Sequence, residues 1–268
     1  LGWADHPARR GGVWALIHAL TCGLVFVIAA RLGAGVWAAA AAAVLFAVHP
    51  IHAESVWALA GRGAAMALMF LLSALLAQLR GRPWLAAGLF LAACWCRETS
   101  VFGALPLAAL ELARRHGDAR SFLRRLEPVA TVVLLVIAFV AQNARYRQLI
   151  DYSARGRPFA WSVAGQVEAV PHGLSLYFRP AALSIDHGER LAHSFAAPLF
   201  WLGAATLLSF VALLVWAIMR RRALVAVGAG LVLAAIVPTQ TLIAKLDPLT
   251  ERPFAAPLSV WNQKRLPW

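Results

Sequence analysis

Charged residues are scarce in this sequence, and acidic residues are the scarcest. Of 268 residues, 14% are charged and 61% are hydrophobic, and the mean hydropathy is +0.70. An ordinary soluble domain of this size does not have such a balance, so lipid is the expected solvent. The 25 Lys and Arg against 12 Asp and Glu give a net charge of +13. Because the arginines lie between apolar runs and are not interleaved with aromatics, this charge does not predict nucleic-acid binding.

Cysteine is nearly absent, and the front of the sequence does not have the pattern of a leader peptide. The three cysteines, Cys22, Cys94 and Cys96, lie inside apolar segments, which argues against a disulfide framework or zinc site and favours core positions. The sequence begins without Met and without a charged region followed by a cleavage site, so no signal peptide is predicted. We expect instead that an upstream segment is missing.

Long apolar runs are abundant, and they do not alternate as the strands of an outer-membrane barrel would. Eight such runs cover 13–31, 35–48, 60–79, 84–96, 101–113, 128–142, 198–219 and 223–238. They predict an all-α polytopic membrane protein of about eight helices, some short, in a single transmembrane domain over 1–268. One long outer loop, 143–197, is predicted to contain an amphipathic helix at the membrane interface from Trp161 to Phe178.

Arginines mark every second connection between the runs, and the positive-inside rule makes these connections cytoplasmic. They include Arg31, Arg80 with Arg82, Arg114, and the triplet 220–222. The alternation requires that 84–113 form two short helices, since one long helix would put Arg80 and Arg114 on opposite sides. Each short helix is about 20 Å long against a hydrocarbon core of about 30 Å. The turn from Arg97 to Ser100 should therefore lie below the outer surface, where ionisable residues are functional candidates.

Four polar clusters fall on the outer face. They are His49, His52, Glu54 and Arg62; Arg97 and Glu98; Arg179, Asp186, His187, Glu189 and Arg190; and Lys245, Asp247, Glu251 and Arg252. The His-x-x-His-x-Glu spacing leaves a divalent metal open beside a hydrogen-bonded loop or substrate site, and we predict no specific metal ligands. An ion pair is the alternative for the second cluster, and a solvated loop or rim for the other two.

Taken together, the clusters place cations and carboxylates at one level of the bilayer. Cations bind a phosphate, and carboxylates accept a proton from an attacking hydroxyl, which suits transfer from a lipid-linked phosphate donor. The candidate catalytic acids are Glu54, Glu98 and Asp186. The candidate substrate-binding residues are His49, His52, Arg62, Arg97, Lys245, Glu251 and Arg252.

Four motifs resemble those of one known family. Residues 45–62, LFAVHPIHAESVWALAGR, resemble the signature LFxxHPxHxExVxxxxGR of the transmembrane-and-tetratricopeptide-repeat O-mannosyltransferases and their bacterial relatives, which belong to the GT-C class of glycosyltransferases. CRETS at 96–100 is similar to the family's KETG, with Arg97 in place of Lys and Ser100 in place of Gly. YFRPAALSID at 177–186 is similar to LLxPxxLSxDY, and Glu251-Arg252 to part of AERFLYLPS.

The resemblance implies a GT-C-like helical bundle that transfers a mannose-like hexose from a polyprenyl-phosphate donor to an acceptor protein or glycan. It implies an enzyme when the chain is full length, in a bacterial inner membrane with the active face outward. The sequence departs from the family at the front, where only Asp5 precedes the first helix, and at the end, where tetratricopeptide repeats are absent. A lipid-linked sugar transporter and a non-enzymatic membrane subunit are the alternatives.

Overall fold

The computed structural model describes residues 7–52, 62–114, 119–144, 147–148, 159–179 and 194–236. Within these ranges the chain forms helices and no strand, which confirms the all-α prediction. The chain divides into two compact units, residues 1–144 with 207–238 and residues 145–206 with 239–268. Each unit is described by itself.

All eight predicted apolar runs are helical in the parts that the structure describes. The helices are α1 (Pro7–Arg31), α2 (Val36–Val48), α4 (Arg62–Leu79), α5 (Pro83–Cys96), α6 (Ala104–Arg114), α7 (Ala119–Gln142), α9 (Phe159–Leu176), α10 (Pro198–Met219) and α11 (Ala223–Ile236), with short 3-10 turns η1 (Pro50–His52) and η3 (Glu98–Gly103). Three segments are long and apolar enough to cross a membrane: Gly11–Arg31, Arg62–Leu79 and Pro198–Met219. The chain is therefore an all-α membrane protein.

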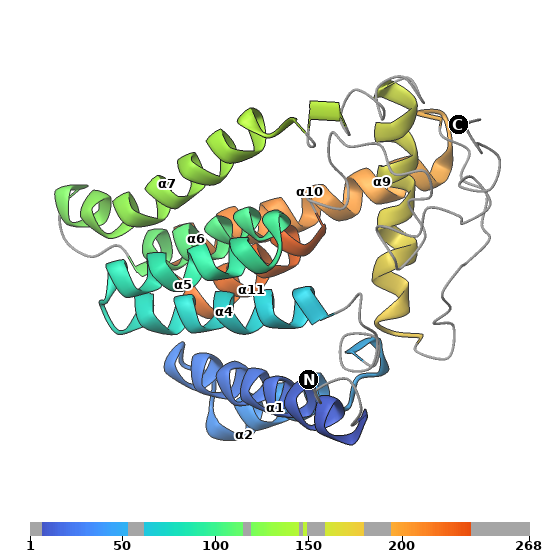
Figure 1. Cartoon of the computed structure of the whole chain (residues 1–268). Helices are drawn as coiled ribbons and strands as arrows, with labels where there is room; N and C mark the ends of the chain where they lie inside the picture. The colour runs from blue at the N-terminus through green and yellow to red at the C-terminus, as the bar shows by residue number, and fades with distance from the viewer. Residues whose placement is uncertain are drawn as a thin grey trace, which may run out of the picture. The chain divides into compact units, whose positions relative to one another are not determined.

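Consecutive helices of the first unit run back and forth (Figure 1). α1 and α4 begin at the same end, because Trp14 and His18 share a hollow with Ala64 and Ala65. α5 returns from a tight turn after α4, and α6 runs back again, since the Arg114 guanidinium donates to the Leu79 carbonyl at 3.4 Å. The prediction that 84–113 is two short helices with Arg80 and Arg114 at one end is thus confirmed.

The first unit has two chemically different ends. We call one the arginine end; it holds Arg31, Arg80, Arg82, Arg114 and Arg220–Arg222 at the helix ends and turns. We call the other the histidine end; it holds His49, His52, Arg62, Arg97 and Glu98. The predicted alternation of the connections is confirmed by this arrangement, whereas the side of the membrane that each end faces stays a prediction.

A close-packed apolar core lies between α4, α5 and α6. Leu75, Phe90, Leu107 and Leu110 are fully buried. α11 packs on α6 through small residues, and a Cβ at Gly230 would lie 3.0 Å from the Cα of Pro106. Small residues let two helix backbones approach closely. In lipid, where the hydrophobic effect does not drive helices together, the van der Waals packing of such close contacts stabilises their association.

Two helices begin before their predicted starts. α1 begins at Pro7, six residues before the predicted start at 13. α7 begins at Ala119, about nine residues before the predicted start at 128. The added turns carry Arg120, Arg124 and Arg125, so they contain no apolar run. Apolar periodicity identifies the part of a helix at membrane depth, whereas α7 continues beyond it as a charged, amphipathic segment.

The second unit contains α9 and the start of α10. The helix predicted from Trp161 to Phe178 is confirmed as α9, Phe159–Leu176, and its place at the interface stays a prediction. Glu168 of α9 is fully buried and accepts a hydrogen bond from the Ser194 N–H at 2.9 Å. A Cβ at Gly203 of α10 would clash with the Val167 carbonyl oxygen, so only glycine permits this contact.

Candidate functional site

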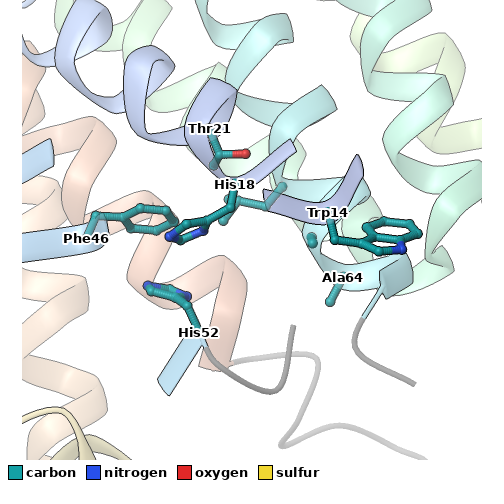
Figure 2. A pocket seen from close by; sticks show the side chains of 8 residues that line it. Trp14, His18, Thr21, Phe46, His52 and Ala64 are labelled. Carbon is teal, nitrogen blue, oxygen red and sulfur yellow. The ribbon is translucent and has the colours of Figure 1, made fainter. Parts of the chain in front are cut away.

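A hollow at the histidine end lies between α1, η1 and α4. Figure 2 shows the His18, Phe46 and His52 rings gathered on one side of it and Trp14 with Ala64 on the other. The full lining is Trp14, His18, Thr21, Phe46, His52, Ala64, Ala65 and Leu68. The wall is therefore mainly aromatic and aliphatic, and its polar groups are the His18 and His52 imidazoles, the Thr21 hydroxyl and the Trp14 indole N–H.

The HPIH segment folds tightly after α2. His49 is the C-cap of α2, with extended backbone (φ −70°, ψ 123°). This conformation suits the residue before a proline, and Pro50 then begins the turn η1. The Ile51 N–H donates to His49 Nδ1 at 3.2 Å. The two histidines consequently come close together, with ring centroids 6.2 Å apart.

His52 lies in a stack of rings. Its centroid is 4.1 Å from that of Phe46 and 5.6 Å from that of His18, and His18 Nε2 lies 3.1 Å from the Ala47 carbonyl oxygen. Burial, with the neighbouring His18 and His49, lowers the pKa of His52 to about 4. His52 is therefore neutral at neutral pH, and it can offer a hydrogen bond but not a positive charge.

Arg62 contacts a wall of this hollow. Its guanidinium carbon lies 5.0 Å from the centre of the Trp14 ring, a cation–π contact that fixes the side chain without neutralising its charge. The buried Arg62 Nε has no hydrogen-bond partner among the described residues. An unsatisfied donor beside a hollow is suited to an anionic ligand.

The second motif meets the first at this end. A Cβ on Gly63 would lie 3.1 Å from the Cys96 carbonyl oxygen, so the first turn of α4 touches the last turn of α5. The next residue, Arg97, caps α5 and precedes η3, which begins at Glu98. Arg62 and Arg97, 35 positions apart in the sequence, therefore lie on helix ends that are in contact.

Arg97 and Glu98 do not satisfy each other. Among the residues with described positions, the ion pair that occurs is Arg125 with Glu111, at 4.0 Å. The alternative interpretation of Arg97 and Glu98 as an ion pair that ties two short helices together is therefore not borne out. Both side chains are half-buried.

The remaining predicted site residues lie outside the described residues. They are Glu54, Asp186, Lys245, Glu251 and Arg252. Arg179 is described, as an exposed residue just after α9 in the second unit, and its N–H donates to the Ser175 carbonyl at 2.9 Å. The structure thus brings together five predicted residues: His49, His52, Arg62, Arg97 and Glu98. Within the described ranges no group of three His, Cys, Asp or Glu could hold a metal ion.

Two features of the first unit were not predicted from the sequence. One is the part of the hollow formed by Trp14, His18 and Phe46. His18 could have been recognised as a candidate site residue, because it is an ionisable residue inside an apolar run. At the arginine end, Gln78 Nε2 donates to the buried Glu111 carboxylate at 3.0 Å and to the Arg125 carbonyl at 3.2 Å. This polar network joins α4, α6 and α7. No periodic pattern in the sequence predicts it.

Comparison with known proteins gives one partial similarity. No family model matches the chain, and no solved structure matches it. Over 125 residues the chain is 38% identical to Protein O-mannosyl-transferase Tmtc2 of Drosophila melanogaster. The matched segment is 42% of this chain and 13% of the fly protein, so the chain spans far less than two thirds of that relative. The similarity supports a distant relationship to a protein O-mannosyltransferase over part of the chain.

Proposed function

We propose that this chain is the membrane part of a glycosyltransferase that moves a mannose-like hexose from a polyprenyl phosphate to a hydroxyl of an acceptor protein or glycan. The reaction would take place at the histidine end, facing away from the cytoplasm. The observation that carries this proposal is the contact of Gly63 with the Cys96 carbonyl. It places the cations of two separate motifs, Arg62 and Arg97, on adjoining helix ends.

Two guanidinium groups suit the chemistry of the donor. When the bond between the sugar and the phosphate breaks, negative charge grows on the departing phosphate oxygen. Fixed cations in a water-poor site stabilise that charge strongly. Arg62 is held in position by Trp14 and keeps a free Nε donor among the described residues. Arg97 has no ion-pair partner there either, so no described carboxylate neutralises either charge.

Glu98 is the described carboxylate closest in the chain to these cations. As the first residue of η3, directly after Arg97, it can accept the proton of the attacking hydroxyl. Glu54 and Asp186 are proposed as the other acids, and Lys245, Glu251 and Arg252 as further substrate-binding residues. His49 and His52 would orient hydroxyl groups by hydrogen bonds.

The helix lengths favour a site below the membrane surface. α2 and α5 have 13 and 14 residues, which makes each about 20 Å long against a hydrocarbon core of about 30 Å. Their ends at His49 and Arg97 therefore fall short of the interface if their other ends are anchored by arginines. The cytoplasmic position of the arginine end follows from the positive-inside rule.

The test is a transfer assay on the full chain reconstituted in vesicles with radiolabelled mannosyl polyprenyl phosphate. We expect release of polyprenyl phosphate together with labelled acceptor. Arg62→Gln and Arg97→Gln should each lower kcat/KM by about 100-fold, the usual effect of removing one stabilising donor. Arg31→Gln, a matched change at the opposite end, should leave turnover unchanged.

Two results would overturn the proposal. One is full turnover in both site variants, which would remove the paired arginines from the reaction. The other is movement of the labelled lipid across the bilayer with no release of polyprenyl phosphate, which would identify a transporter.

A further inference from the structure

Three turns at the arginine end share one backbone geometry. They follow α1, α4 and α10, and each ends its helix with the same pair of hydrogen bonds. One N–H donates to the carbonyl three residues earlier and the next to the carbonyl five residues earlier, at 2.8 to 3.1 Å. This is the Schellman motif, whose key residue is in the left-handed conformation, and glycine is the usual occupant.

One of the three turns departs from that preference. Gly33 and Gly81 occupy the left-handed position in the first two turns, with φ of 94° and 71°. In the third turn the position belongs to Arg221, with φ of 56°, and among the described residues it alone combines a side chain with a positive φ. A side chain in this conformation is strained, so Arg221 makes the turn less stable than glycine would.

The turn concentrates positive charge that nothing on the described chain neutralises. Arg220, Arg221 and Arg222 are all exposed, and none forms an ion pair with another described residue. Arg222 also precedes the first turn of α11, whose unsatisfied N–H groups add partial positive charge. Three exposed cations and a helix start are thus adjacent in one turn.

Aromatic residues place this turn at the level of lipid headgroups. Trp216 lies one helical turn before Arg220 and is 48% exposed. Trp37 and Trp84 stand just after the other two turns and are 86% and 71% exposed. Exposed tryptophans at helix ends are typical of the membrane–water interface. Anionic phosphates are concentrated at that depth.

We propose that the α10–α11 turn, Arg220–Arg222, is a binding site for the headgroup of an anionic phospholipid. Arg221 takes the left-handed position because its guanidinium completes a three-arginine clamp on the lipid phosphate, where glycine would leave a gap. The site is independent of the sugar-transfer proposal, because it lies at the opposite end of the first unit.

The test separates charge from backbone strain. The full chain is reconstituted in phosphatidylcholine with increasing phosphatidylglycerol, and bound phosphatidylglycerol is counted by native mass spectrometry. Removing one arginine should weaken its binding about five-fold. Arg221→Gln should show this loss and Arg221→Lys should retain most binding. Arg31→Gln, at the same end but on a turn with glycine in the left-handed position, should have a much smaller effect.

Arg221→Gly is the decisive variant. It should lose the same five-fold affinity while its thermal midpoint in pure phosphatidylcholine rises, because the strain is relieved. Opposite changes in stability and lipid binding are not expected of a purely structural residue. Unchanged phosphatidylglycerol binding in Arg221→Gly, or an equal loss in Arg31→Gln, would overturn the proposal and leave only the general charge of this end.

Discussion

The contact of Gly63 with Cys96 can be tested by adding a side chain at position 63. An alanine Cβ would lie 3.1 Å from the Cys96 carbonyl oxygen, inside the 3.4 to 4 Å of ordinary contact, so the helix ends must part by a few tenths of an ångström. Valine adds two methyl groups to the same gap. Overpacking of this kind costs about 1–3 kcal/mol, and small misplacements of positioning groups can lower catalysis about 100-fold.

The assay compares two glycines on neighbouring helices. Gly88→Ala, in the middle of α5 with open space around its Cβ, should be stabilised by about 0.5–1 kcal/mol through helix propensity. Gly63→Val should unfold at lower temperature than the wild type and transfer sugar at a strongly reduced rate. If Gly63→Val were as stable and as active as Gly88→Ala, the close approach of the two motifs and its importance for the site would both be refuted.

Three further predictions concern other parts of the chain. Glu111→Ala should destabilise the first unit by about 1–3 kcal/mol, because it removes the acceptor of the buried Gln78 amide, whereas Glu111→Gln should cost less in the same unfolding assay. Gly203→Ala should destabilise the second unit by at least as much, since its Cβ would clash with the Val167 carbonyl oxygen; a loss of protease resistance in α9 would show this. The pKa of His52 falls from an ordinary 6.5 to about 4 on folding, so the unfolded chain takes up the proton first and the thermal midpoint should fall as pH drops from 6.5 towards 4. His52→Gln should lack this part of the pH dependence, and an unchanged slope would contradict the buried, neutral state.

The helices could be predicted because lipid imposes a simple rule on sequence. Every backbone group at membrane depth must be bonded within the chain, so each long apolar run becomes a helix. Counting arginines was enough to divide 84–113 into α5 and α6, and the bond from Arg114 to the Leu79 carbonyl confirms it. The start of α7 was missed because Arg120 and Arg124 lie on turns beyond the apolar run.

The site was only partly predictable, because its walls come from helices that meet through tertiary packing. The HPIH and RETS motifs identified His49, His52, Arg62, Arg97 and Glu98, since ionisable residues next to apolar helices stand out. Trp14 and Phe46 look like ordinary apolar residues in their own segments. Their role follows from the packing of α1 against both α2 and α4, which joins segments about 30 and about 50 residues apart.

The most direct test of the central claim is a distance between spin labels at positions 62 and 97. The labels would be attached to Arg62→Cys and Arg97→Cys in a chain whose three native cysteines are replaced by alanine. The reference pair is 62 with 80, which the 18 residues of α4 separate by about 27 Å. We predict a clearly shorter distance for 62 with 97, whereas an equal or longer one would contradict a shared site at the histidine end.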